Sequence, residues 1–367
     1  MSKLLAFLAA LPIATLRPGV ALAEEGGFYG LLRMRDLTPF GFLRLDMRPA
    51  HAVSIEQGTW ATEFELGYQN TWALSAPVEH YLTSIESEGR HALGPADIQA
   101  IRDLPGENYL VDSEVATLDA IIHYKFSDAL AGYLIVSGVS YQGGFLDSAI
   151  EGFHRALGFN TFGRPALQKN RVNLFYDLKS AQLVSLGSPT DGGLLDPTIG
   201  VRYTRFHVSR PWALTVEAAA KVPLDGARTL LSTGHADYGL QASLQRRGVR
   251  HAFYINAEAI YYGGAEFPVP QDSQVIPTLI VGYEYRWTEH TNLNVQAYAG
   301  SSVYSHDETD LKELTSTKYQ YSLGIRHRIG PGVITFGITE NVQNINNTPD
   351  IGFQLGYAYV PHAKDFH

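Results

Sequence analysis

The chain has 367 residues, a formal net charge of −9, 35 glycines, 21 tyrosines and no cysteine. The lack of cysteine excludes a disulfide framework and thiol chemistry, and the acidic balance argues against a nucleic-acid partner, which needs a basic surface. The mean hydropathy of −0.09 is compatible with a membrane barrel, because half of each barrel strand faces water.

The first residues have the pattern of a secretory signal peptide, 1–23. Lys3 precedes an apolar run from Leu4 to Leu16, and the small residues around Ala21 and Ala23 form a cleavage site. A single membrane helix is the alternative, but this apolar run is shorter than the roughly 20 residues that a span needs. We therefore predict export and cleavage near Ala23.

The next segment, 24–57, does not alternate cleanly. It carries four arginines among leucine, phenylalanine and proline residues: Arg33, Arg35, Arg44 and Arg48. Three interpretations are open for this segment. The pattern favours a periplasmic strap under a barrel over a plug that enters the lumen, and an extra pair of strands is the third.

Residues 60–72 show the clearest alternation. One face carries Trp60, Thr62, Phe64, Leu66, Tyr68, Asn70 and Trp72. A period of two residues predicts a β-strand. A strand of this length, at about 3.3 Å per residue and a tilt of about 40°, rises about 30 Å, which is enough to cross a bilayer. Tryptophan at both ends of the apolar face is typical of an aromatic girdle.

Eleven further segments repeat this alternation. We predict strands at 60–72, 114–126, 131–141, 199–206, 212–222, 236–246, 251–262, 275–287, 291–302, 318–329, 333–340 and 350–360. The even number suits a single-chain bacterial barrel. We therefore expect an all-β fold, an antiparallel transmembrane β-barrel of about 12 strands over residues 58–360, followed by a C-terminal tail, 361–367. The predicted girdle comprises Trp60, Trp72, Tyr133, Tyr141, Trp212, Tyr261, Tyr285, Trp287 and Tyr359.

Short and long connections alternate along the chain. Turns are expected near 128, 210, 249, 289 and 331, and loops at 74–112, 142–194, 223–235, 263–274, 303–317 and 341–349. Short turns are typical of the periplasmic side and long loops of the outer side. Both chain ends are then expected in the periplasm. The first loop also holds a predicted short helix, 96–104, with Pro95 at its first turn.

The long insert, 142–194, contains a predicted amphipathic helix, 145–157. Its apolar stripe is Phe145, Leu146, Ala149, Ile150, Phe153, Ala156 and Leu157. Its polar residues are Asp147, Glu151, His154 and Arg155. A helix of this kind must cover a surface. We expect it to cap the outer mouth or fold into the lumen, in preference to lying on the outer leaflet.

The alternation also predicts which charged residues line the lumen. They are Glu63, Glu65, Asp119, Lys125, Arg202, Glu217, Lys221, Asp237, Glu258, Glu284, Arg286, Arg326 and Arg328. A lining of one sign would predict ion selectivity, and this mixture does not. The charges are expected either to pair across a closed lumen or to order water and pass a small polar solute.

Three stretches resemble a known family. They are Leu31 to Phe40, then Pro49 to Val53 with Gly58 to Trp60 and Gln69 to Trp72, and finally Gly143 to Phe159. They resemble the signatures of an uncharacterised bacterial group called domain of unknown function 3187, which is taken to consist of outer-membrane barrels. The resemblance covers nearly the whole mature chain. It implies a barrel in the outer membrane of a Gram-negative cell, but no reaction, substrate or catalytic residue.

A membrane hydrolase would need a serine within reach of a histidine. His327 is predicted to face outward and Ser322 inward, so these two do not meet. Ser305, His306 and Asp307 are loop neighbours, and His123 and His235 face the lumen without a matching serine. We therefore predict no catalytic residue, cofactor or metal site. An acidic loop at Asp307, Glu308, Asp310 and Glu313 fits solvated carboxylates better than a calcium site.

The leading functional interpretation is a passive channel or transporter for a small solute. Arg33 and Arg35 would gate it against acids such as Glu63 and Glu65. A closed structural or envelope-interaction barrel is the alternative, and a hydrolase is the third. The expected partners are outer-membrane lipids, the barrel assembly machinery and, for a channel, a small solute, but no nucleic acid.

Overall fold

The computed structural model describes residues 27–50, 57–187, 192–209, 211–224, 230–341 and 345–359. The predicted signal peptide, 1–23, the tail, 361–367, and residues 51–56 of the N-terminal segment lie outside the described residues.

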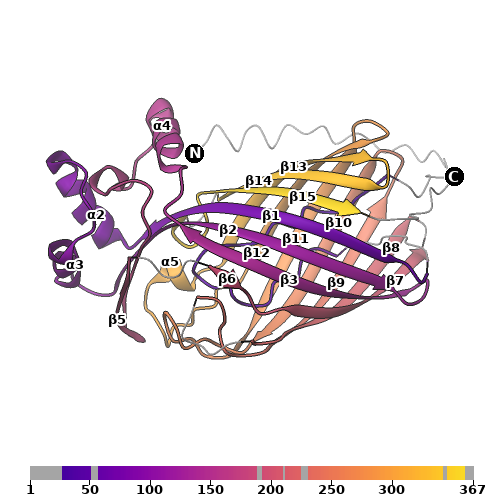
Figure 1. Cartoon of the computed structure of the whole chain (residues 1–367), viewed down its shortest axis with the longest axis horizontal. Coiled ribbons are helices and arrows are strands. Elements are labelled where there is room, and N and C mark those ends of the chain that lie inside the picture. Colours follow the sequence, from indigo (N-terminus) through magenta and orange to yellow (C-terminus); the bar gives the residue numbers. More distant parts are fainter. Residues whose placement is uncertain are drawn as a thin grey trace.

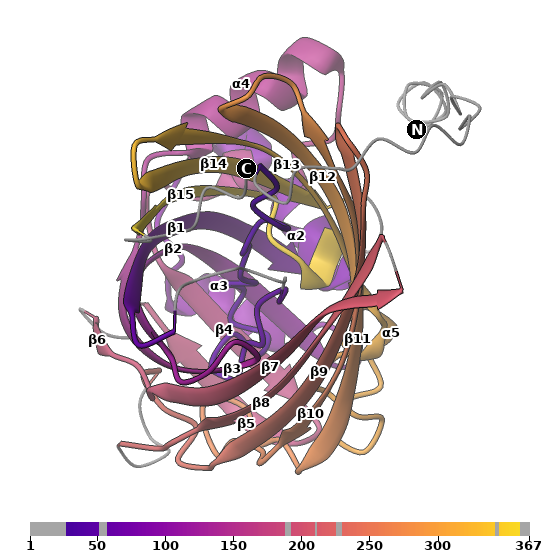
Figure 2. The ribbon, with the colours of Figure 1, turned by 90° about the vertical axis from the view of Figure 1, so that its right-hand side faces the viewer.

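Twelve antiparallel strands close into a barrel (Figures 1 and 2). They are β1 (Trp60–Leu74), β2 (Asn108–Lys125), β3 (Leu130–Gln142), β7 (Thr198–Ser209), β8 (Trp212–Lys221), β9 (Asp237–Arg247), β10 (His251–Tyr262), β11 (Gln274–Arg286), β12 (Thr291–Gly300), β13 (Lys318–Ile329), β14 (Gly332–Asn341) and β15 (Ile351–Tyr359). The last strand pairs with the first, with Leu66 opposite Leu355, so the barrel has no open edge. The predicted twelve-strand barrel is confirmed.

Alternating burial shows why these strands form a transmembrane wall. In β10, Phe253, Ile255 and Tyr261 are about half exposed, whereas Tyr254 and Asn256 are fully buried. The apolar residues form the outer surface, and the polar ones face the lumen. A strand with these two faces is stable only between lipid and a polar interior, which a closed barrel supplies.

The orientation predicted for β3 is wrong. Tyr133 pairs with His123 and Tyr141 with Val115, and directly opposed residues share one face of a sheet. Because His123 faces the lumen, Tyr133 and Tyr141 also do, and neither belongs to the girdle. The outward residues of β3 include Leu134 and Val136. Both faces of this strand are apolar, so its alternation could not show which face meets lipid.

Short elements lie around the end of the barrel that carries the long loops. They are α2 (Ala76–Ile85), η1 (Glu86–Glu88), α3 (Pro95–Arg102), α4 (Asp147–Leu157), η2 (Arg164–Ala166), α5 (Lys312–Thr315), η3 (Ile345–Asn347), β4 (Asn173–Leu178), β5 (Ala181–Leu186) and β6 (Gly193–Leu194). The predicted helix at 96–104 corresponds to α3. Helix α2 and strands β4 to β6 are not foreseen by the sequence pattern. Among the described helices, none is long and apolar enough to cross a membrane.

Trp72 does not belong to the aromatic girdle either. It is 5% exposed and packs in an apolar cluster with Leu74, Val78 on α2 and Phe175 on β4. Its indole nitrogen donates to the carbonyl of Phe162 (2.9 Å). Strand β2 has 18 residues and rises about 45 Å, more than a bilayer core needs. The end of β1 beside it therefore extends past the lipid and is covered by protein.

Candidate functional site

Residues 27–50, which we call the lumen loop, lie inside the barrel (Figure 2). The loop starts at the end with the short turns, where the carboxylate of Glu284 accepts hydrogen bonds from the amides of Tyr29 (2.8 Å) and Gly30 (3.0 Å). It reaches the opposite end at Phe40, whose ring lies 5.8 Å from that of Tyr109. It then returns along β8 and β9. The described part of the segment therefore follows the lumen alternative and does not run as a strap under the barrel.

Inward polar side chains of the wall form hydrogen bonds with the backbone of the lumen loop. The side chain of Gln296 accepts from the amide of Leu32 (2.8 Å) and donates to its carbonyl (3.1 Å). Gln69 accepts from the amide of Leu37 (2.8 Å) on the outgoing limb. On the returning limb, Asp237 accepts from the amide of Leu45 (2.7 Å). Buried backbone groups need such partners, so these side chains hold both limbs in place.

Arginines of the lumen loop pair with the predicted inward acids. Arg33 lies 3.2 Å from Glu63, which agrees with the pairing proposed from the sequence. Arg48 contacts both Glu65 (2.7 Å) and Asp119. Arg35, by contrast, lies 3.7 Å from Asp119 and donates to the carbonyl of Phe42 (3.0 Å). Glu65 is therefore held by Arg48, a residue that the sequence did not connect to it.

A lysine on the wall anchors the tip of the lumen loop. The ammonium group of Lys318 contacts Asp36 (2.9 Å), the hydroxyl of Thr38 (3.2 Å) and the carbonyl of Phe40 (2.8 Å). Asp36 and Lys318 are both almost fully buried. Three acceptors around one buried cation offset the cost of removing it from water.

Apolar side chains surround this tip at the long-loop end of the barrel. Phe40 and Phe42 pack with Tyr141, Val303 and Tyr304, within a cluster that also takes in the outer loops. This apolar packing holds the tip of the lumen loop against the wall and the outer loops at this end of the barrel.

Inward glycines of the wall make room for the lumen loop. A Cβ atom built on Gly239 would lie 2.3 Å from Met47 Sδ, and one on Gly282 would lie 2.3 Å from Leu31. The same holds at Gly324, which faces Leu32 at 2.8 Å. Glycine is unfavourable in a strand interior and often marks the close approach of another backbone. These glycines are the signal in the sequence that could have identified the lumen loop.

We expect Gly239→Val to displace the returning limb, because its side chain would overlap Met47 and Leu45. Trypsin cleavage after Arg44, which precedes Leu45 on the same limb, should become faster while the barrel stays folded. Gly138→Val is the matched control, since an added Cβ at Gly138 meets nothing closer than 3.8 Å. Equal cleavage of the two variants would contradict the steric role of Gly239.

The remaining predicted lumen charges point inward and mostly meet partners on the wall. Arg202 pairs with Glu217 (2.7 Å), and Lys221 pairs with Asp237 (2.9 Å). Lys125, Glu258, Glu284 and Arg326 are buried, whereas Arg286 and Arg328 are half-buried near the short turns.

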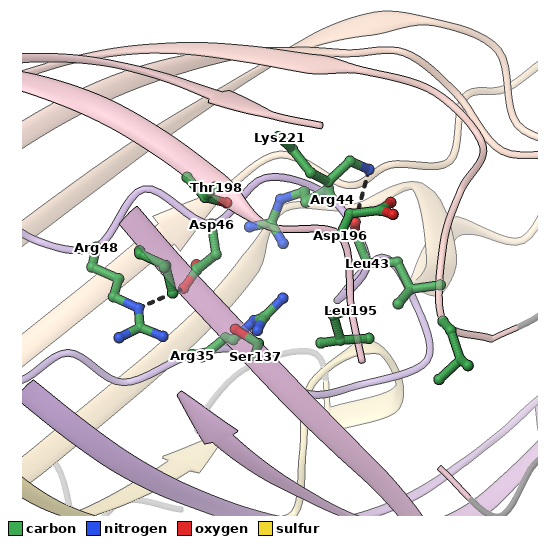
Figure 3. Close-up of a pocket in the computed structure, with 12 residues that line it drawn as sticks. Arg35, Leu43, Arg44, Asp46, Arg48, Ser137, Leu195, Asp196, Thr198 and Lys221 are labelled. Carbon is green, nitrogen blue, oxygen red and sulfur yellow. Dashed lines mark hydrogen bonds and ion pairs between the residues drawn. The ribbon is translucent and has the colours of Figure 1, made fainter. Parts of the chain in front are cut away.

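A pocket remains between the lumen loop and the wall (Figure 3). Arg35, Arg44 and Asp46 line it from the loop, and Ser137 and Lys221 line it from the wall. The Nε atoms of Arg35 and Arg44 are buried and have no hydrogen-bond partner among the described residues. One carboxylate oxygen of Asp46 also has no hydrogen-bond partner among the described residues, so the pocket lining carries both unpartnered cationic donors and an unpartnered acceptor.

The acidic face of α4 is buried in ionic contacts with the first and second outer loops. Asp147 accepts from Arg164 (3.0 Å) and from the amide of Asn170 (2.7 Å). Glu151 contacts Arg90 (2.6 Å) and Lys169 (3.0 Å). His154 contacts the carbonyl of Asn160 (2.8 Å), and the side chain of Arg155 donates to the carbonyl of Glu151 (3.3 Å). Figure 2 shows α4 outside the ring of strands, so the helix lies neither in the lumen nor across the mouth, and the favoured expectation is wrong.

These contacts predict that the attachment of α4 to the outer loops depends on pH. Burial alone would raise the pKa of Glu151, but the hydrogen bonds from Arg90 and Lys169 lower it below its usual 4.5. A lowered pKa stabilises the contact above about pH 4.5, and the contribution is lost as the pH falls through the folded-state value. A spin label on Leu157→Cys should become more mobile upon acidification. Glu151→Gln should abolish this change, and an unaltered pH profile in that variant would contradict the assignment.

The other predicted girdle residues lie on the outer surface. Trp60, Tyr261, Trp287 and Tyr359 are 40–59% exposed, and Trp212 and Tyr285 are partly exposed. Trp60, Trp212 and Trp287 all lie next to short turns. They mark one border of the lipid-facing band.

The candidate serine and histidine of a hydrolase lie on opposite sides of the wall. The hydroxyl of Ser322 is buried beside that of Thr339 (2.8 Å). His327 is exposed on the outer face beside Thr291 (2.9 Å). This pair cannot form a catalytic dyad. In the acidic loop, Glu308 instead accepts hydrogen bonds from the backbone amides of Ser305 and Asp272.

The solved structures that resemble this chain include outer-membrane proteins. The COG4313 outer-membrane channel from Pseudomonas putida F1 has a TM-score of 0.52 at 11% identity, over 85% of this chain and 99% of that chain. The porin NanC has a TM-score of 0.42 at 6% identity, over 81% and 98%. At 11% identity the first likeness shows a shared fold and no more.

No curated protein matches the chain. Residues 14–360 match the family described as "Protein of unknown function (DUF3187)". Since this match spans most of the sequence, the chain belongs to the DUF3187 family.

Proposed function

We propose that the protein is a passive outer-membrane channel for a small polar solute, and that the lumen loop closes it in the present conformation. The observation that carries this proposal is the pocket between the loop and the wall, with the unpartnered Nε atoms of Arg35 and Arg44. A purely structural lumen has no need of buried donors that lack acceptors, because each one is destabilising. The likeness in fold to an outer-membrane channel supports the same proposal.

The location follows from the same reasoning. A closed barrel with an apolar outer band and a predicted signal peptide, 1–23, suits export and insertion into the outer membrane. Assembly machinery would act on the exported chain. Tyr359, at the end of the last described strand, is the aromatic residue best placed to serve as its recognition signal.

A closed structural barrel is the second candidate. It is favoured by the many contacts of the lumen loop with the wall, such as those of Arg48 and Lys318. The two candidates differ in whether the loop moves. A channel requires it to shift or to leave a path, whereas a structural barrel keeps it in place.

A reversible crosslink tests this difference. The chain has no cysteine, and the Cγ atom of Met47, which a cysteine sulfur would replace, lies 3.0 Å from the Cβ position of Gly239. Met47→Cys with Gly239→Cys therefore suits a disulfide. We expect no conductance steps in a planar bilayer when the pair is oxidised, and steps of solute-sensitive size after reduction. The matched control is Gly239→Cys alone, which should conduct equally with and without reductant.

Two other conductance results would contradict part or all of this proposal. Steps that persist in the oxidised double variant would mean that solute passes beside a fixed loop, so the channel would stand but the gate would not. Silence of both forms, with a barrel that remains folded and heat-modifiable on a gel, would overturn the channel and favour the structural barrel.

A further inference from the structure

Helix α4 is oriented in the opposite sense to an amphipathic helix on a water-soluble protein. Two of its large apolar side chains are exposed, Phe153 at 58% and Leu157 at 55%, whereas Ile150 is buried. The flanking residues Phe145 and Phe159 are 68% and 54% exposed. Its carboxylates, by contrast, are buried. An apolar patch of this kind in water is unfavourable and normally marks an interaction surface.

Specific contacts hold α4 in this orientation. Arg164 holds the first turn through Asp147, and Arg90 with Lys169 holds the middle through Glu151. At the start of the helix, the carboxylate of Glu114 on β2 accepts hydrogen bonds from the amides of Phe145 (3.1 Å) and Leu146 (2.8 Å). The helix cannot roll over to hide its apolar face without breaking these buried ionic contacts.

The apolar face of α4 continues the lipid-facing wall of the barrel. The ring of Phe145 stacks on that of Tyr68 at 5.2 Å, and Tyr68 lies on the outward face of β1. It follows Trp60, at the short-turn border, by eight residues, a rise of about 20 Å along the membrane normal. The apolar band of such barrels is about 25 Å tall. Phe145 therefore sits near the outer border of the band.

Two views of the molecule place α4 to the side of the barrel. In Figure 1 it projects sideways from the long-loop end of the barrel, and in Figure 2 it lies outside the ring of strands. Helices α2 and α3 instead lie beyond the end of the barrel. A helix placed outside the ring, at the height where the apolar band ends, overlies the membrane surface.

The exposed charge on α4 suits an anionic surface. Asp147 and Glu151 are buried, and Arg155 is the exposed ionic residue of the helix. Arg171, close to Gly143 at the base of the insert, is also exposed. Basic residues beside an aromatic face are typical of helices that lie in the interface of anionic lipid.

We propose that α4 is an interfacial anchor that inserts its phenylalanine face into the outer leaflet beside the barrel. The occupant of this surface is the lipid itself, between the headgroups and the first carbons of the acyl chains. The anchor fixes the insert, 142–194, against the membrane and keeps the loops that it contacts beside the mouth. This role does not depend on whether the lumen conducts.

Spin labels on the full chain test the anchor, since no native cysteine competes for the label. Phe153→Cys reports on α4, Leu118→Cys on the lipid-facing wall and Glu88→Cys on the outer loops, and all three native residues are exposed. The protein is placed in vesicles of phosphatidylethanolamine and phosphatidylglycerol. Collision rates of each label are measured with oxygen, which concentrates in lipid, and with a water-soluble nickel chelate on both sides.

We expect the label at Phe153 to have an oxygen-to-nickel ratio at least threefold above that at Glu88, and below that at Leu118. A ratio equal to that at Glu88 would overturn the anchor. Shielding from both reagents would also overturn it, because a second copy or another protein surface would then cover α4. Leu157→Cys is a second reporter on the same face, and heat modifiability verifies that each labelled barrel is folded.

Discussion

Arg48→Ala is expected to destabilise the folded barrel by about 3–5 kcal/mol, the usual cost of removing one partner from a buried ion pair. Arg48 is 5% exposed and contacts both Glu65 and Asp119. Without it, the two buried carboxylates lose the cation that contacts both of them, and Arg35 remains 3.7 Å from Asp119. Urea unfolding followed by tryptophan fluorescence measures the loss.

The same substitution should release the returning limb of the lumen loop. Under the proposed function, Arg48→Ala would then show conductance steps under conditions where the unaltered chain is mostly silent. Arg250→Ala is the matched control, because Arg250 lies exposed in the turn before β10 and its removal should change neither stability nor conductance. If the two variants had the same unfolding midpoint, the central role of Arg48 would be refuted.

Arg164→Ala is expected to detach the insert from the barrel. The guanidinium group of Arg164 contacts Asp147 (3.0 Å), Asn70 (2.9 Å) and Asp350, and stacks over Trp72 at 4.9 Å. It therefore ties the insert to β1 and to the loop before β15. Its loss leaves Asp147 buried without its guanidinium partner, which costs several kcal/mol locally.

Limited proteolysis separates this local effect from global unfolding. Trypsin should cut at Lys169 and Arg171 at least tenfold faster in Arg164→Ala, while the strands remain protected and the barrel remains heat-modifiable. Arg155→Ala, at an exposed position on α4, should leave cleavage at these two sites nearly unchanged. Protection of the insert in Arg164→Ala would show that other contacts hold it.

Local alternation was sufficient to predict the strands, because each strand separates the same two environments. Lipid outside and polar groups inside select residues at a period of two, as in β10 from Phe253 to Tyr261. At β3 the predicted orientation is wrong, because Tyr141 and Val139 face apolar groups of the lumen loop. There the inner environment is no longer polar, so the alternation cannot distinguish the lumen face from the lipid face.

The candidate site was predicted only in part. The inward acids Glu63, Glu65 and Asp119 follow from alternation, but their partners lie on a segment without a repeating pattern. The contact of Lys318 with Asp36 joins residues 282 positions apart. The orientation of α4 likewise depends on Arg90 and Arg164, which belong to other parts of the outer loops.

The sequence by itself determined the strand number, the alternation of turns and loops and the family, because these depend on local composition and on a repeated period. The tertiary structure alone decided that residues 27–50 fill the lumen, that β3 turns its tyrosines inward, and that α4 exposes its phenylalanines. Each of these depends on which distant side chains a segment meets. Burial and ion pairing between such groups are absent from any single stretch of sequence.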